Sequence, residues 1–166
     1  MGRPSDPEHP DVASADATSA DDARRRLREQ GIVAVEPDAR IGVMLGPGER
    51  VVAVRHGVSM ERRKDTRDPE EGLLGDLYVT TSRLVHLGSV PVEIRLLDIS
   101  EAVTAAGALR LVVADGRGVE IRTGDPCVLR VEIAAVREAA RMLAAGSHDT
   151  QETGDSAGSG GQASSR

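Results

Sequence analysis

The sequence contains no phenylalanine and no tryptophan, and Tyr78 is its only aromatic residue. Proteins that bind single-stranded nucleic acid stack the bases on aromatic side chains, so the sequence argues against this class. The net charge of −6 argues against any nucleic-acid partner, because such proteins carry a cationic excess. We therefore expect no nucleic-acid partner and a core of aliphatic side chains packed around Tyr78.

Cys127 is the single cysteine, which excludes an intramolecular disulfide, a zinc ribbon and a CxxC redox pair. The first residues lack the apolar stretch of a secretion signal, and the longest aliphatic runs are too short to cross a bilayer. Together these absences lead us to expect a cytoplasmic protein. A peripheral contact with a membrane is compatible with this location.

Apolar residues are concentrated in the middle of the chain. Of the 42 Ile, Leu, Val and Met residues, 39 lie between Gly31 and Gly146. Residues 1–20 and 147–166 are rich in small and polar residues, and burial could not offset the entropy lost on ordering them. We expect a disordered acidic tail at 1–20, one domain at 31–146 and a disordered polar tail at 147–166.

The negative charge follows the same division. Residues 1–22 carry −5 and residues 146–166 carry −2, which leaves +1 for residues 23–145. Between the first tail and the domain, residues 21–30 predict a short basic helix that ends at Gly31. Leu27 is its only large apolar residue, so we expect this helix either to fray or to pack on a partner. Its arginines, 24 to 26 and 28, either contact an anionic surface or face solvent.

From Glu49 onward the apolar residues recur with a period of two, which is typical of strands. The first strand is long, and Gly57 is a candidate for a bulge within it. Asp115-Gly116 is a strong turn signal before the last strand. The pattern predicts seven strands, at residues 49–62, 74–81, 83–88, 92–96, 101–105, 109–114 and 119–123.

The last element has helical spacing. Leu129, Ile133 and Val136 recur at intervals of four and three, and Gly146 is expected to end the pattern. Asp125-Pro126 would begin the helix well, but alternation around Val131 leaves a start anywhere between 126 and 131 open. Seven antiparallel strands and one amphipathic helix predict a mainly β fold, a bent sheet or partly open barrel capped by the C-terminal helix.

Several segments of this pattern resemble the bacterial pleckstrin-homology-like domains and the related GRAM domains. Those families have a Gly-Glu before the first strand, a Gly-x-Leu-Tyr-Val-Thr-x-x-Arg-Leu segment in the next hairpin and an Asp-Gly turn before the last strand. The matching positions here are Gly48-Glu49, Gly75 to Leu84 and Asp115-Gly116. The resemblance covers about Pro47 to Ala145, and it departs from eukaryotic members in lacking a tryptophan on the last helix.

The resemblance implies a non-enzymatic binding module. Some members of these families bind proteins, which makes an adaptor that recognises a protein partner or itself the first hypothesis. Such binding would use an exposed strand edge or an aliphatic groove. Others bind phosphoinositide head groups through basic residues of the first strand and the loop after it, which makes an anionic lipid surface the second hypothesis.

The candidate anion-binding residues are Arg55, Arg62, Arg63, Lys64 and Arg67. Arginine forks suit bidentate contacts with phosphate, and clustered cations are attracted to anionic bilayers. Residues 55–64 carry +3, but residues 65–76 carry −4. The alternative is that this basic segment pairs with the acidic residues beside it.

Known catalytic and metal-binding patterns are absent from the sequence. No nucleophile and base are placed together, and no glycine-rich loop leads into a helix. His56 and His86 are expected on the inner, apolar faces of their strands, and they lack further ligands of suitable type. Cys127 lies at a helix N-terminus, which can activate a thiol, but we expect it to serve as a small buried apolar residue. We expect no enzyme activity, no cofactor and no metal.

Overall fold

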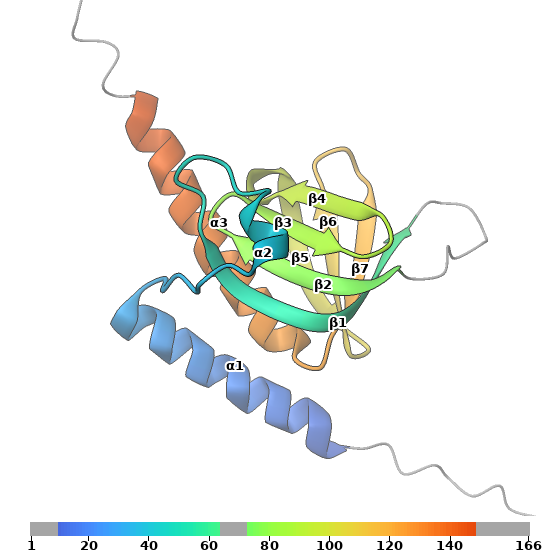
Figure 1. Cartoon of the computed structure of the whole chain (residues 1–166). Helices are drawn as coiled ribbons and strands as arrows, with labels where there is room; N and C mark the ends of the chain where they lie inside the picture. Colours follow the sequence, from blue (N-terminus) through green and yellow to red (C-terminus); the bar gives the residue numbers. More distant parts are fainter. Residues whose placement is uncertain (1–9, 64–72, 149–166) are drawn as a thin grey trace, which may run out of the picture.

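The computed structural model describes residues 10–63 and 73–148 (Figure 1). The seven predicted strands are all present within a few residues of their expected bounds. The elements in chain order are α1 (Pro10–Gln30), α2 (Ala39–Gly42), β1 (Val51–Arg63), β2 (Leu73–Thr80), β3 (Arg83–Leu87), β4 (Pro91–Arg95), the 3-10 helix η1 (Leu96–Asp98), β5 (Ile99–Ala105), β6 (Ala108–Val113), β7 (Gly118–Arg122) and α3 (Pro126–His148).

The strands form one antiparallel sheet in the order β4-β3-β2-β1-β7-β6-β5. β1 pairs with β2 along most of its length, and its last residues, Ser59–Arg63, also pair with β7. Gly57 lies at a shift of register between Arg55 and Val58 and has φ of 65°, so the predicted bulge is confirmed. β4 and β5 are the two edges, and the barrel is therefore not closed.

α3 packs against η1, β5, β6 and β2, and so covers the open end of the bent sheet (Figure 1). Leu129, Ile133 and Val136 are buried in an aliphatic core with residues from the strands, as their spacing predicts. The helix begins at Pro126, at the early end of the predicted range. It continues to His148, which corrects the predicted end at Gly146: this glycine does not adopt the left-handed backbone that ends helices.

Tyr78 does not lie in this core, which corrects the prediction of a core packed around it. It belongs to a second cluster of buried residues together with Ile41, Val51, Val85 and Leu87. This cluster is covered by the short helix α2, whose Asp38 cap accepts a hydrogen bond from the Tyr78 hydroxyl at 2.6 Å. The hydrogen bond from Tyr78 therefore attaches the segment before β1 to the sheet, on the face opposite the main core.

The N-terminal helix also differs from the prediction. α1 begins at Pro10, not at residue 21, so residues 10–20 are helical and not part of a disordered tail. Residues 1–9 and 149–166 of the expected tails lie outside the described residues. Ala20 and Ala23 are buried against Val128 and Val131 of α3, because small side chains let the two helices approach closely. The partner of α1 is therefore α3 of the same chain.

The sheet, open between β4 and β5 and capped by a C-terminal helix, has the predicted pleckstrin-homology-like architecture. No helix within residues 10–63 and 73–148 is both long and apolar enough to cross a membrane.

Candidate functional site

Arg55, the first candidate for anion binding, lies in the middle of β1 and is tied to the last helix. Its Nε donates to both carboxylate oxygens of Asp125 at 2.9 Å, and its Nη2 donates to Glu132 at 2.8 Å. The side chain is only 17% exposed. Burial would lower the pKa of Arg55, but these two carboxylates raise it overall. Arg55 joins β1 to α3, and each of its three guanidinium nitrogens is hydrogen-bonded within the chain.

Arg62 and Arg63 lie at the far end of β1. A strand rises about 3.3 Å per residue, which places Arg62 roughly 20 Å from Arg55. Arg62 is exposed, and Arg63 is the last residue of the strand. Lys64 and Arg67 lie outside the described residues. The structure therefore separates Arg55 from Arg62 and Arg63 instead of gathering them into one site.

Arg62 borders a hollow of about 370 Å³ between β4 and the ends of β6 and β7. Arg95 and Arg117 also line it, as do the acidic residues Glu93 and Asp98. Arg117 is paired with Asp115, whereas no carboxylate partner is seen for Arg62 or Arg95 within the described parts of the chain. We call this site the β4 hollow. Its remaining lining residues are Val92, Ile94, Val113, Gly118 and Val119.

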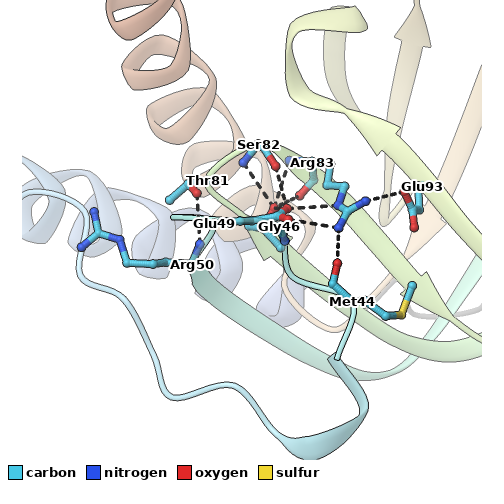
Figure 2. Close-up of polar contacts among 9 residues, drawn as sticks. Met44, Gly46, Glu49, Arg50, Thr81, Ser82, Arg83 and Glu93 are labelled. Carbon is cyan, nitrogen blue, oxygen red and sulfur yellow. Dashed lines mark hydrogen bonds and ion pairs between the residues drawn. The ribbon is translucent and has the colours of Figure 1, made fainter. Parts of the chain in front are cut away.

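The residues that carry the family resemblance form a buried polar network at the start of β1 (Figure 2). Glu49 accepts hydrogen bonds from the Thr80 and Ser82 hydroxyls at 2.6 Å, from Arg83 Nε and Nη2 at 3.0 Å and from the Gly46 N–H at 2.8 Å. Its side chain is 7% exposed. The network joins the turn before β1 to the turn between β2 and β3.

The charges of this network are internally satisfied. Burial alone would raise the pKa of the Glu49 carboxyl, but the hydrogen bonds from Gly46, the two hydroxyls and the Arg83 guanidinium lower it to about 2. Arg83 also donates to the Met44 carbonyl at 2.6 Å and to Glu93 at 2.7 Å. Glu49, Thr80 and Arg83 are thus bonded to one another and to the turn before β1, which is a structural role.

The histidines divide into one exposed and one buried residue. His56 is exposed, contrary to the expected apolar face, and its Nδ1 lies 3.1 Å from Asp76. The left-handed Gly57 beside it shifts the register of β1, so the simple alternation of faces fails there. His86 is fully buried with Nε2 at 3.0 Å from the Val58 carbonyl. No three metal-ligating side chains come together within residues 10–63 and 73–148.

Cys127 lies half-buried at the junction of α1 and α3. Its backbone N–H donates to Asp16 of α1 at 3.0 Å, and its thiol is 3.9 Å from the Thr104 hydroxyl. The Asp16 carboxylate, and then burial, raise the pKa of the thiol. A raised pKa disfavours the nucleophilic thiolate, so the helix N-terminus does not activate this cysteine.

A groove that sequence patterns did not reveal runs along the outer edge of β5. It has a volume of about 610 Å³, and its walls come from β5, α1 and α3. The floor is made of small or aliphatic side chains. We call it the β5 groove, and its lining residues are Arg24, Leu27, Arg28, Ser100, Glu101, Ala102, Arg130, Val131, Ala134, Ala135 and Arg137.

Four arginines and one glutamate line the β5 groove, which makes it more basic than the β4 hollow. Arg137 Nη2 reaches the Ser100 carbonyl at 3.4 Å. The Nε atoms of Arg130 and Arg137 are buried and have no hydrogen-bond partner. Such unpaired buried donors are uncommon in folded proteins and mark places where an acceptor is missing.

A third hollow, of about 630 Å³, lies between α1, the segment after it and the first half of β1. Its lining is mostly aliphatic, and its buried charges, Arg55 and Glu132, are bonded to each other. Its other polar lining residues, Arg26, Gln30 and Glu36, are exposed and not buried. We therefore take the β5 groove, which holds buried unpaired donors, and the β4 hollow as the two candidate sites.

No protein-family model matches the sequence, and no curated protein matches it either. Similar solved structures include the pleckstrin homology domain of USP37, with 20% identity, a TM-score of 0.40 and coverage of 52% of this chain and 97% of that one. The N-terminal pleckstrin homology domain of human ARAP2 has 15% identity, a TM-score of 0.34 and coverage of 67% and 93%.

A third similar structure is the C-terminal domain of an unknown protein from Leishmania infantum. It has 10% identity and a TM-score of 0.35, and the match covers 46% of this chain and 72% of that one. At TM-scores below 0.5, these likenesses transfer no ligand and no activity to this chain. The function has to be argued from the two candidate sites themselves.

Proposed function

We propose that this chain is a protein-recognition module that binds an extended segment of a partner in the β5 groove. The observation that carries the proposal is the open edge of β5 with the β5 groove directly beside it. An unpaired strand edge offers a row of backbone donors and acceptors, and an extended peptide can add to it as one more strand. The groove would then receive every second side chain of that peptide.

The other sheet edge is less suited to this role. β4 begins with Pro91, which has no backbone N–H to donate, and it is shorter than β5. β5 contains no proline and runs for seven residues. Strand addition therefore favours β5 over β4.

Filling the β5 groove with a bulky side chain should weaken peptide binding strongly. Ala134 is exposed on α3 and lines the groove, so Ala134→Trp blocks it without entering the core. Ala144→Trp is the matched control, because Ala144 is an exposed residue of the same helix outside the groove. Peptides are selected from a random dodecapeptide phage library with the full chain as bait, and their affinities are measured by fluorescence anisotropy.

The expected result is a loss of about tenfold or more, equivalent to about 1.4 kcal/mol, with Ala134→Trp and no loss with Ala144→Trp. Both substitutions carry the same small cost in helix propensity, so a general loss of stability would affect both. A library that yields no binders, or binders that tolerate Ala134→Trp, contradicts the proposal.

A second candidate function, contact with anionic head groups, is favoured by the β4 hollow. Arg62 and Arg95 line it and have no carboxylate partner in the part of the chain that the structure describes. If head groups bind there, the protein should pellet with vesicles containing anionic phospholipid and not with neutral vesicles. Arg62→Gln with Arg95→Gln should reduce pelleting about tenfold, whereas Arg28→Gln, outside the hollow, should not.

Added salt should release the bound protein, since screening weakens exposed charge pairs. An absence of pelleting at low salt contradicts this second candidate and leaves the β5 groove as the one site. Pelleting that survives the double substitution places the membrane contact elsewhere on the chain.

A further inference from the structure

We propose that the β5 groove selects acidic segments, in which two acidic residues four positions apart flank a small apolar residue. The inference rests on the proposed function and adds the chemistry of the partner to it. Its basis is the pair of arginines on α3, Arg130 and Arg137, which line the groove and lie before and after Ala134 on the helix.

The arginines of the groove lack enough anions of their own. Arg24 is paired with Asp21, and Glu101 is the one acidic residue in the lining. Neither Arg130 nor Arg137 makes an ion pair with a carboxylate in the described parts of the chain, and the Nε atom of each is buried without an acceptor. An incoming carboxylate or phosphate would supply that acceptor, which makes anion binding favourable there.

The state of Arg137 agrees with a missing anion. Burial, and then the neighbouring Arg141, lower the pKa of the Arg137 guanidinium. This is the reverse of Arg55 and Arg83, whose pKa values are raised by their carboxylate partners. Of these three half-buried arginines, Arg137 is the one that faces a groove and has no carboxylate partner.

The spacing of the two arginines matches an extended chain. Arg130 and Arg137 are two helical turns apart, or about 10 Å along α3. The first and fifth residues of a strand are about 13 Å apart and lie on the same face. Long, flexible arginine side chains can make up the difference between these two distances. Their planar guanidinium groups bind carboxylate or phosphate through two hydrogen bonds.

The centre of the groove determines which residue fits between the two acidic residues. The third residue of the strand faces the same side as the first and fifth, and it would lie over Ala134 and Ala135. These small side chains leave room for a small apolar residue such as alanine or valine. The segment is therefore acidic–x–apolar–x–acidic, in which the residues marked x face away from α3.

A second copy of this chain is a poor occupant. Two β5 edges paired around a twofold axis would bring two basic grooves together, and like charges in contact disfavour that assembly. An acidic segment would instead be attracted by the arginines that line the groove. A dimer that dissociates on Ala134→Trp in analytical ultracentrifugation would overturn the inference by showing that the groove pairs with itself.

The test uses the full chain and the random dodecapeptide library. Recovered sequences should contain acidic residues four positions apart, and selection on the Arg130→Gln/Arg137→Gln variant should lose this preference. A recovered acidic peptide should bind that variant about tenfold or more weakly, and its glutamine counterpart should bind both proteins alike. Arg62→Gln/Arg95→Gln, outside the β5 groove, is the charge-matched control, because it also removes two positive charges. Versions with phosphoserine at the two acidic positions show whether phosphate or carboxylate is preferred.

Each outcome separates the inference from the function on which it rests. Neutral or basic peptides that still depend on an open Ala134 position overturn the acidic preference and leave strand addition intact. Acidic peptides whose affinity is unchanged in the Arg130→Gln/Arg137→Gln variant also overturn it. A library that yields nothing dependent on Ala134 overturns both.

Discussion

Glu49→Ala is expected to lower the free energy of unfolding by about 3–4 kcal/mol, because it removes a buried carboxylate and leaves its hydrogen-bond donors without their acceptor. The substitution deprives Arg83, two hydroxyls and the Gly46 N–H of their shared acceptor (Figure 2). Urea denaturation followed by circular dichroism measures the change. Glu93→Ala is the control, because Glu93 also pairs with Arg83 but is 43% exposed, and its loss should cost below about 1 kcal/mol.

The dependence on pH tests the same network independently. Glu49 has a pKa of about 2 in the folded chain and an ordinary value of 4.5 when unfolded. Its ionised form therefore stabilises the fold fully above pH 4.5, and this contribution is lost as the pH falls from 4.5 to 2. The difference in stability between the unchanged chain and Glu49→Gln should shrink over that range. A difference that stays constant there would contradict an ionised, hydrogen-bonded Glu49.

The sheet could be predicted from the sequence because its residues alternate. Val58 and Met60 of β1, and Leu77 and Val79 of β2, are all buried in the main core, and a period of two identifies such residues directly. The period does not say which residues cover the opposite face. Tyr78 was therefore placed wrongly: its cover is α2, a helix of four residues that is too short to show a pattern.

α1 could not be predicted in full because its contacts use small side chains. Ala20 and Ala23 pack against α3, yet neither contributes to a pattern of large apolar residues. The stretch from Pro10 to Ala20 consequently resembles a tail in composition. Its helix depends on α3, including the hydrogen bond from the Cys127 N–H to Asp16, and that partner lies more than a hundred residues further along the chain.

The family pattern includes residues that stabilise the fold. Glu49, Thr80 and Arg83 hold two turns together, and they are bonded to each other. The β5 groove was missed because its arginines come from α1 and α3, which meet only in the folded chain. Each of these arginines, taken alone, is typical of a solvated helix. Only the pairing of α1 with α3 beside an open strand edge shows that they share a groove.

Arg55→Met is the second substitution for which we expect a large effect, a loss of about 2–3 kcal/mol of folding stability. Without its guanidinium, Asp125 and Glu132 would face each other with no cation between them, and the Glu132 side chain is 15% exposed. Thermal or urea unfolding measures the loss. Arg62→Met is the matched control, because this exposed arginine has no partner in the described residues and should change stability by less than about 0.5 kcal/mol.

The pH dependence of this variant has a definite sign. Burial already raises the pKa of Glu132 above 4.5, although Arg55 lowers it, so removing Arg55 raises it further. The ionised form of Glu132 then opposes folding, which makes the deficit largest at neutral pH and smaller as the pH falls toward 4.5. Arg55→Met/Glu132→Gln should recover part of the loss at neutral pH. If Arg55→Met instead folds as stably as the unchanged chain and loses vesicle binding, Arg55 binds anions and does not serve to join β1 to α3.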